Sequence, residues 1–279
     1  MGDPYSFHPF SMQRFFQHIT HDGYSAWLFI LPALILISLF ALPLLALSLR
    51  AINADFFDYA FSEQALNALR LSLITSSVTV GITVFFGTPL AYILARWKFP
   101  SKSYLELLVD LPIVLPPSVA GIALLIAFGR QGLFGPILNA LGIHLPFTTP
   151  AVVMAQIFVA APLYVRAARI GFAEIDIQLE ESARVEGANQ WQLFSEVMFP
   201  LAGRALVNGA ILTWARALGE FGATILFAGN LEGVTQTMPM AIYLGFERSL
   251  GVAIVLSVVL IGISVVLLGV IRKLERQDH

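Results

Sequence analysis

The segment ESARVEGANQWQLFSEVMFP, residues 181–200, is the longest polar stretch between two strongly apolar runs of this chain. Gly187 divides it into two short patterns in which apolar residues recur three or four positions apart, a spacing that puts them on one face of a helix. These apolar residues are Ile175, Leu179 and Ala183 before the glycine, and Trp191, Phe194 and Met198 after it. The segment therefore predicts two short amphipathic helices that meet at a glycine, a shape suited to a groove on another protein.

The rest of the chain has the composition of an integral membrane protein. Of its 279 residues, 57% are hydrophobic and only 12% are charged, whereas about a quarter of a soluble domain is charged. Only three lysines are present and no basic stripe, which argues against a nucleic-acid partner. The absence of cysteine excludes disulfides and thiolate-bound metal.

Six stretches reach the length of about 20 apolar residues that a helix needs to cross a bilayer. They are residues 27–49, 69–95, 105–128, 151–170, 205–227 and 252–271. The first stretch is too long for the apolar region of a signal peptide, and little positive charge precedes it, so we expect it to be retained. The predicted organisation is an N-terminal segment 1–26, a first span with its outer loop 27–60, and a core 61–275.

Lysine and arginine positions predict the orientation of these spans. With the N-terminus in the cytoplasm, eleven Lys and Arg side chains fall in cytoplasmic segments and four fall outside. Cytoplasmic loops carry the excess of positive charge in membrane proteins. Both termini and the 181–200 segment are therefore predicted to be cytoplasmic.

Two features inside the spans are candidates for a translocation pathway. The third span begins with LPIVLPPS, which includes Pro117 and Ser118, and helices broken by proline at membrane depth often line a pathway. The fifth span carries Arg216 and Glu220, four residues apart, which on one helix can pair directly. Because a charge at the bilayer centre costs at least about 2.5–3.5 kcal/mol, neither side chain should face lipid. The pair either lines a pathway for a small oxyanion or locks the helix to a neighbour.

The chain has no nucleotide-binding motif of its own. No GxxxxGK[ST] phosphate loop is present, and neither HExxH nor GxSxG occurs. The composition and motifs thus predict a non-catalytic membrane subunit that needs no cofactor or metal.

The 181–200 segment resembles the cytoplasmic signature of permease subunits of bacterial and archaeal ABC importers. That signature is Glu-Ala-Ala, three residues, Gly, nine residues and Ile-x-Leu-Pro. Here it reads Glu181-Ser182-Ala183, then Gly187, then VMFP ending at Pro200. The departures are Ser for Ala, Val for Ile and Phe for Leu.

Within that family, four segments look like the molybdate/tungstate branch. They are ARALGEFGATILFAGN at 215–230, TQTMPMAIY at 235–243, LPIVLPPSVAG at 111–121 and the GRQGLFGP loop at 129–136. Sulfate/thiosulfate permeases are similar in these stretches, but usually have Tyr where this chain has Phe221.

The resemblance implies an all-α permease of the type I importer fold in the inner membrane. It further implies a second copy of the chain, two cytoplasmic ATP-binding subunits and an external oxyanion-binding protein. The residues expected to couple to the ATPase are Glu181, Ser182, Ala183, Gly187, Ala188, Trp191 and Pro200. A secondary transporter acting alone and a membrane-embedded enzyme are the other classes considered. The first would need an internal repeat or several ionisable groups within the membrane, and the second a cluster of catalytic residues; neither is apparent.

Overall fold

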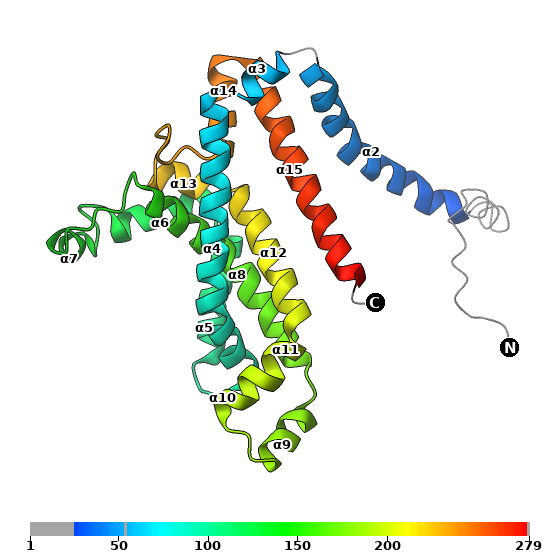
Figure 1. The fold of residues 1–279 in the computed structure, drawn as a ribbon, viewed down its shortest axis with the longest axis vertical. Coiled ribbons are helices and arrows are strands. Elements are labelled where there is room, and N and C mark those ends of the chain that lie inside the picture. Colours follow the sequence, from blue (N-terminus) through cyan, green and yellow to red (C-terminus); the bar gives the residue numbers. More distant parts are fainter. Residues whose placement is uncertain (1–24, 53–54, 278–279) are drawn as a thin grey trace. The chain divides into compact units, whose positions relative to one another are not determined.

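The computed structural model describes residues 25–52 and 55–277, and every regular element in these ranges is a helix (Figure 1). The predicted N-terminal segment 1–26 lies almost wholly outside the described residues. Up to the fourth predicted span, the helices are α2 (Ser25–Ile52), α3 (Phe56–Ala60), α4 (Glu63–Arg96), α5 (Lys102–Val114), α6 (Pro117–Phe128), α7 (Gly135–Ala140) and α8 (Thr149–Glu174). They are followed by α9 (Ile177–Val185), α10 (Gln190–Gln192), the π-helix η1 (Leu193–Met198), α11 (Phe199–Leu201), α12 (Gly203–Leu218), α13 (Gly222–Phe227), α14 (Met238–Arg248) and α15 (Leu250–Gln277).

These helices belong to two separate units. The first contains α2, a helix of 28 residues whose large apolar side chains are exposed along its length. A helix that is apolar on all sides is suited to lipid, as the sequence predicted for its first span. The second unit contains α3 to α15.

The core of the second unit is formed by α4 and α8, with α12 packed against both (Figure 1). Small residues allow the close approach: a Cβ atom added to Gly87 of α4 would lie only 2.9 Å from the ring of Tyr164 on α8. Buried polar side chains join the same two helices. Gln156 of α8 accepts a hydrogen bond from Thr79 at 3.0 Å and donates one to Thr75 at 3.2 Å. Hydrogen bonding satisfies these buried polar groups, which would otherwise be costly in an apolar interior.

Three helices of the described residues are long and apolar enough to cross a membrane, and the number rises to five if each sharply bent pair counts as one span. The sixth predicted span, 252–271, falls within α15. The chain is thus an all-helical protein with several membrane-crossing segments.

The third predicted span is not one straight helix. Residues 105–128 form α5 and α6, which meet at 118° around Leu115 and Pro116. Proline has no N–H group for the helical ladder and pushes the residue before it out of helical geometry. The two adjacent prolines, Pro116 and Pro117, therefore end one helix and begin the next.

The fifth predicted span is also interrupted. Helix α12 ends at Leu218, and α13 begins only at Gly222. The prediction that Arg216 and Glu220 share one helix is therefore wrong, because Glu220 lies in the break. Gly219 forms the end of α12, and the Glu220 carboxylate accepts a hydrogen bond from the Ala223 backbone N–H at 2.8 Å, which satisfies a donor of the new helix.

Candidate functional site

The turn between α9 and α10 is built around Gly187. Its φ of +94° lies where side chains other than glycine's are disfavoured. The backbone N–H of Gly187 donates to Arg184 O at 3.1 Å, and that of Ala188 donates to Ala183 O at 3.0 Å. This pair of bonds is the Schellman arrangement that ends a helix at a glycine.

The second helix begins directly after this turn. The Asn189 side chain accepts hydrogen bonds from the backbone of Trp191 and Gln192, and the Gln192 side chain accepts one from the backbone of Asn189. Such a reciprocal capping box fixes where a helix starts. The turn thus holds two short helices at a defined angle, as the sequence predicted from the glycine.

The predicted apolar faces are only partly correct. Leu179 and Trp191 are exposed, whereas Leu193 and Met198 are fully buried. The reason is that residues 193–198 form a π-helix, in which equivalent positions are about five residues apart rather than three or four. Leu193 and Met198, five apart, therefore face the core together.

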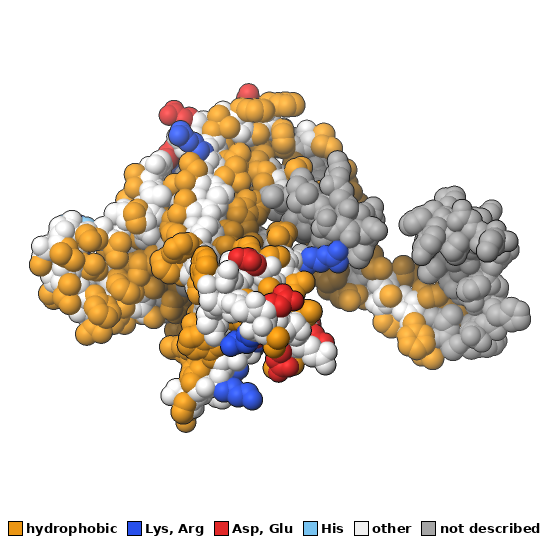
Figure 2. Space-filling model, turned by 60° about the horizontal axis from the view of Figure 1, so that its bottom comes forward, with side chains coloured by type: hydrophobic (Ala, Val, Ile, Leu, Met, Phe, Trp, Pro, Cys, Tyr) orange, Lys and Arg blue, Asp and Glu red, His pale blue; other side chains and the backbone are white. Residues whose placement is uncertain are grey.

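The predicted coupling residues lie mostly at the surface of this segment. Glu181, Ser182, Gly187, Trp191 and Pro200 are exposed, and Ala183 and Ala188 are half-buried. The Trp191 side chain is 71% exposed, although the centroid of its ring lies 6.0 Å from the centroid of the Phe194 ring. Figure 2 shows charged side chains gathered over this end of the second unit, with hydrophobic side chains on the flanks.

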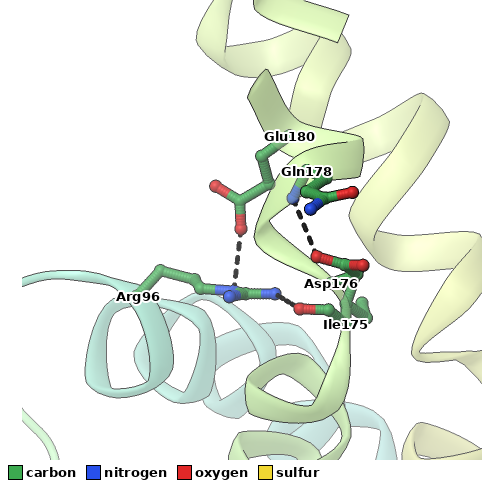
Figure 3. Close-up of polar contacts among 5 residues, drawn as sticks. All are labelled: Arg96, Ile175, Asp176, Gln178 and Glu180. Atoms are coloured by element: carbon green, nitrogen blue, oxygen red, sulfur yellow. Dashed lines mark hydrogen bonds and ion pairs between the residues drawn. The ribbon is translucent and has the colours of Figure 1, made fainter. Parts of the chain in front are cut away.

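Two residues that the sequence did not single out tie this segment to the helical core. The Arg96 Nε atom lies 2.8 Å from Oε1 of Glu180, and another guanidinium nitrogen donates to Ile175 O at 2.5 Å (Figure 3). Arg96 and Ile175 are 79 positions apart in sequence. The only signal for the contact was a cation directly after the second predicted span and an acidic residue beside the signature.

The charged pair predicted in the fifth span forms across the helix break. A guanidinium nitrogen of Arg216 lies 2.6 Å from Oε2 of Glu220. The Glu220 side chain is 1% exposed and the Arg216 side chain is 33% exposed. The carboxylate is therefore held on one side by Arg216 and on the other by the Ala223 N–H, while part of the cation remains accessible.

The structure also brings the Pro-rich break close to this pair. A Cβ atom on Gly222 would lie 2.8 Å from the Cβ of Pro117 and 3.5 Å from the backbone nitrogen of Ser118. A Cβ atom on Gly121 would lie 2.8 Å from the Ala223 carbonyl oxygen. The broken helices α6 and α13 thus contact each other through glycines, and Pro117 and Ser118 lie beside the break that contains Glu220.

Sequence comparison identifies the family to which this chain belongs. The model of the family described as "Binding-protein-dependent transport system inner membrane component" matches residues 87–277. The chain belongs to this family. It is therefore a permease subunit of an ABC importer and a multi-pass component of the inner membrane.

Individual relatives point to related systems. The molybdenum transport system permease protein ModB of Mycobacterium bovis is 40% identical over 245 residues, which cover 88% of this chain and 92% of the relative. The sulfate transport system permease protein CysW of Synechococcus elongatus is 38% identical over 181 residues, which cover 65% of this chain and 63% of the relative.

The fold also matches a solved transporter. A bacterial ABC transporter involved in the import of the acidic polysaccharide alginate contains a chain that superimposes with a TM-score of 0.78 at 18% identity, covering 95% of this chain and 99% of the other. At this identity the match concerns the fold alone, which is that of ABC importer permeases.

Proposed function

We propose that this permease forms the membrane pathway for a small oxyanion, molybdate or tungstate. The proposal rests on the molybdenum permease relative, which matches at higher identity and over more of both chains than the sulfate permease relative. Sulfate is the second candidate, because the sulfate relative is only slightly less identical.

Uptake by the complete transporter tests the choice of anion. Membrane vesicles that contain the permease, its ATP-binding subunits and its binding protein should take up labelled molybdate, and unlabelled tungstate should compete. Sulfate should compete poorly. Uptake of labelled sulfate that molybdate does not reduce would contradict the proposal.

The proposed topology has six spans with both termini in the cytoplasm. The excess of Lys and Arg in the predicted cytoplasmic segments supports this orientation. Helices α5 and α6 then count together as the third span and α12 supplies the fifth, while α2 and α15 provide the first and last. A reporter fused to the C-terminus that is active only in the cytoplasm should be active.

The exposed part of α9 to α11 is proposed to dock on a cytoplasmic ATP-binding subunit. Its support is the exposure of large apolar side chains at an end of the second unit where charged side chains also gather. Trp191 and Val185 are the most exposed of them. Exposed apolar groups with polar surroundings are typical of protein interaction sites. Glu181 and Ser182 lie on the same exposed part.

The pathway is proposed to pass the break between α12 and α13. Its support is that Arg216 keeps a third of its side chain exposed, and that Pro117 and Ser118 lie against the same break. Because Glu220 neutralises Arg216, an oxyanion would be attracted only weakly, and weak binding allows an ion to leave as well as to enter.

The proposed assembly contains two copies of this chain, two ATP-binding subunits and an external binding protein. The family description names the binding protein as part of such systems. Binding of ATP would close the two ATP-binding subunits on each other, and the docked helices α9 to α11 would pass that movement to the spans.

A further inference from the structure

Arg96 stands where three helices of the permease meet. It is the last residue of α4, the longest helix of the second unit, with 34 residues. Its guanidinium binds the Glu180 carboxylate, which belongs to α9, and the Ile175 carbonyl, which follows the end of α8. Figure 3 shows the guanidinium between these two groups.

The contact is almost closed to solvent. The Arg96 side chain is 14% exposed and the Glu180 side chain 10% exposed. An ion pair in such a place is costly to break from one side, because the remaining charge is left without a partner. The neighbouring acidic residue Glu181, by contrast, is exposed. Of the two adjacent glutamates in α9, Glu180 therefore faces the core and Glu181 faces outward.

Aromatic rings also pack the segment that follows α8, residues 175–201, against the core. The rings of Tyr92, Phe172 and Phe194 pack at centroid distances of 5.1 to 6.2 Å. Such ring pairs have preferred geometries, and each contributes about 0.5–1.5 kcal/mol beyond its buried area, but none involves a charged group. Arg96 donates a charge-assisted, directional hydrogen bond to the Ile175 carbonyl and forms a close ion pair with the Glu180 carboxylate. Arg96 therefore provides a charged link between the end of α4 and α9, which the aromatic rings on α4, α8 and η1 do not.

Helix α4 is in turn fixed to the rest of the core. Thr88 shares a hydrogen bond of 2.5 Å with Tyr164 of α8, and Thr75 and Thr79 bond with Gln156 further along. Helix α12, which ends at the charged break, packs against both α4 and α8. A displacement of α9 that reaches α4 is thus passed to the helices beside the proposed pathway.

We propose that Arg96 and Glu180 form a strut that carries the movement of α9 into α4 during transport. Both are positioning residues, which touch neither the anion nor ATP. The inference rests on the proposed function, since it assigns a role within the coupling of ATP hydrolysis to transport.

The test uses the assembled transporter in lipid nanodiscs with its cognate binding protein. ATP hydrolysis per assembled complex is measured with and without molybdate-loaded binding protein, and the ratio of the two rates is the stimulation. The variants are Arg96→Met, Glu180→Gln and the double variant. The matched control is Glu106→Gln, which removes the ion pair of 3.0 Å between Glu106 and Arg169, on α5 and α8, without touching α9.

Each single variant should lower the stimulation by about fivefold or more, the lower end of the usual coupling between two sites. Basal hydrolysis should persist. The double variant should lose no more than the single ones, because both remove the same contact. The control should keep the wild-type stimulation. A residue that only supports folding would change the yield of complex and leave the stimulation per complex unaltered.

Several results would overturn the strut. They are unchanged stimulation in both single variants, losses that add in the double variant, and failure of all three variants to assemble, which would make the pair a folding contact. A wild-type complex that neither molybdate nor sulfate stimulates through the binding protein would instead contradict the proposed function. Equal stimulation in wild type and variants counts against the strut alone.

Discussion

Replacing Gly187 tests whether the coupling turn is held by its backbone conformation. The φ of this residue is +94°, and a Cβ atom added to it would meet nothing within 4 Å. The cost of alanine is therefore conformational and not steric. An L-residue in a left-handed conformation costs roughly 1–2 kcal/mol. This corresponds to a shift of about 5- to 30-fold in the ratio of the native turn to altered turns.

A series of substitutions separates conformation from size. Asparagine enters left-handed conformations more readily than alanine although it is larger, and the β-branched valine enters them least. The docked complex should therefore weaken in the order Gly, Asn, Ala, Val. Gly203→Ala is the matched control: it also has open space around the added Cβ, and its φ is not positive, so it should behave as the wild type.

The assay is the amount of ATP-binding subunit that copurifies with a tagged permease over a range of subunit concentrations. Thermal unfolding of the permease alone shows whether each variant is folded. If affinity instead follows side-chain size, with asparagine below alanine, a bound partner touches Gly187 directly. The conformational argument would then be refuted.

Three further predictions concern the membrane part. Gly222→Ala places a Cβ 2.8 Å from the Pro117 side chain and should lower stability by about 1–3 kcal/mol, whereas Gly81→Ala, with open space, should not; melting temperatures in detergent check both. Gln156→Leu removes the side-chain hydrogen bonds to Thr75 and Thr79, whose hydroxyls keep bonds of 3.4 Å to backbone carbonyls, and should cost about 0.6–1.7 kcal/mol in the same measurement. Arg216→Met should abolish most molybdate uptake in vesicles. Normal uptake by a correctly inserted variant would show that Arg216 is not needed in the pathway.

Sequence patterns predict the parts of this fold that depend on local chemistry. The predicted spans 27–49, 69–95 and 151–170 lie within the long helices α2, α4 and α8. Length and apolar composition are enough to predict such membrane-crossing helices. Gly187 gives the coupling turn, because only glycine enters its conformation freely.

The helix breaks are harder to predict from sequence. Both are placed by several weak signals that act together: adjacent prolines at one, and at the other two glycines with a carboxylate that caps the next helix. The residues on both sides of each break are mostly apolar, so a hydropathy profile predicts one continuous span at each. The π-helix at 193–198 leaves no signal of its own, and its wider spacing buries Leu193 where a regular helix would bury Trp191.

Long-range polar contacts lie beyond what these patterns contain. Arg96 meets Glu180 only because α8 returns the chain to the end of α4, and neither residue belongs to a motif. The same holds for Gln156, whose partners on α4 are an ordinary stretch of Ser and Thr until the two helices are placed side by side.

The position of Glu220 bears on whether its ion pair locks the bundle or lines a pathway. A carboxylate that serves only Arg216 would have no reason to lie in a helix break. Here one oxygen binds Arg216 and the other binds the first turn of α13, where the helix dipole also favours negative charge. The carboxylate end is therefore structural, and it is the buried end. The guanidinium end is partly exposed and is the only half of the pair that an anion could approach.

Glu220→Gln should accordingly destabilise the break between α12 and α13 and leave Arg216 a stronger anion site. Slower release of molybdate, seen as a lower maximal uptake rate at a lower half-saturating concentration of the loaded binding protein, would support this division. If the variant loses stability but keeps the wild-type uptake kinetics, the ion pair only holds the helices together and does not line the pathway.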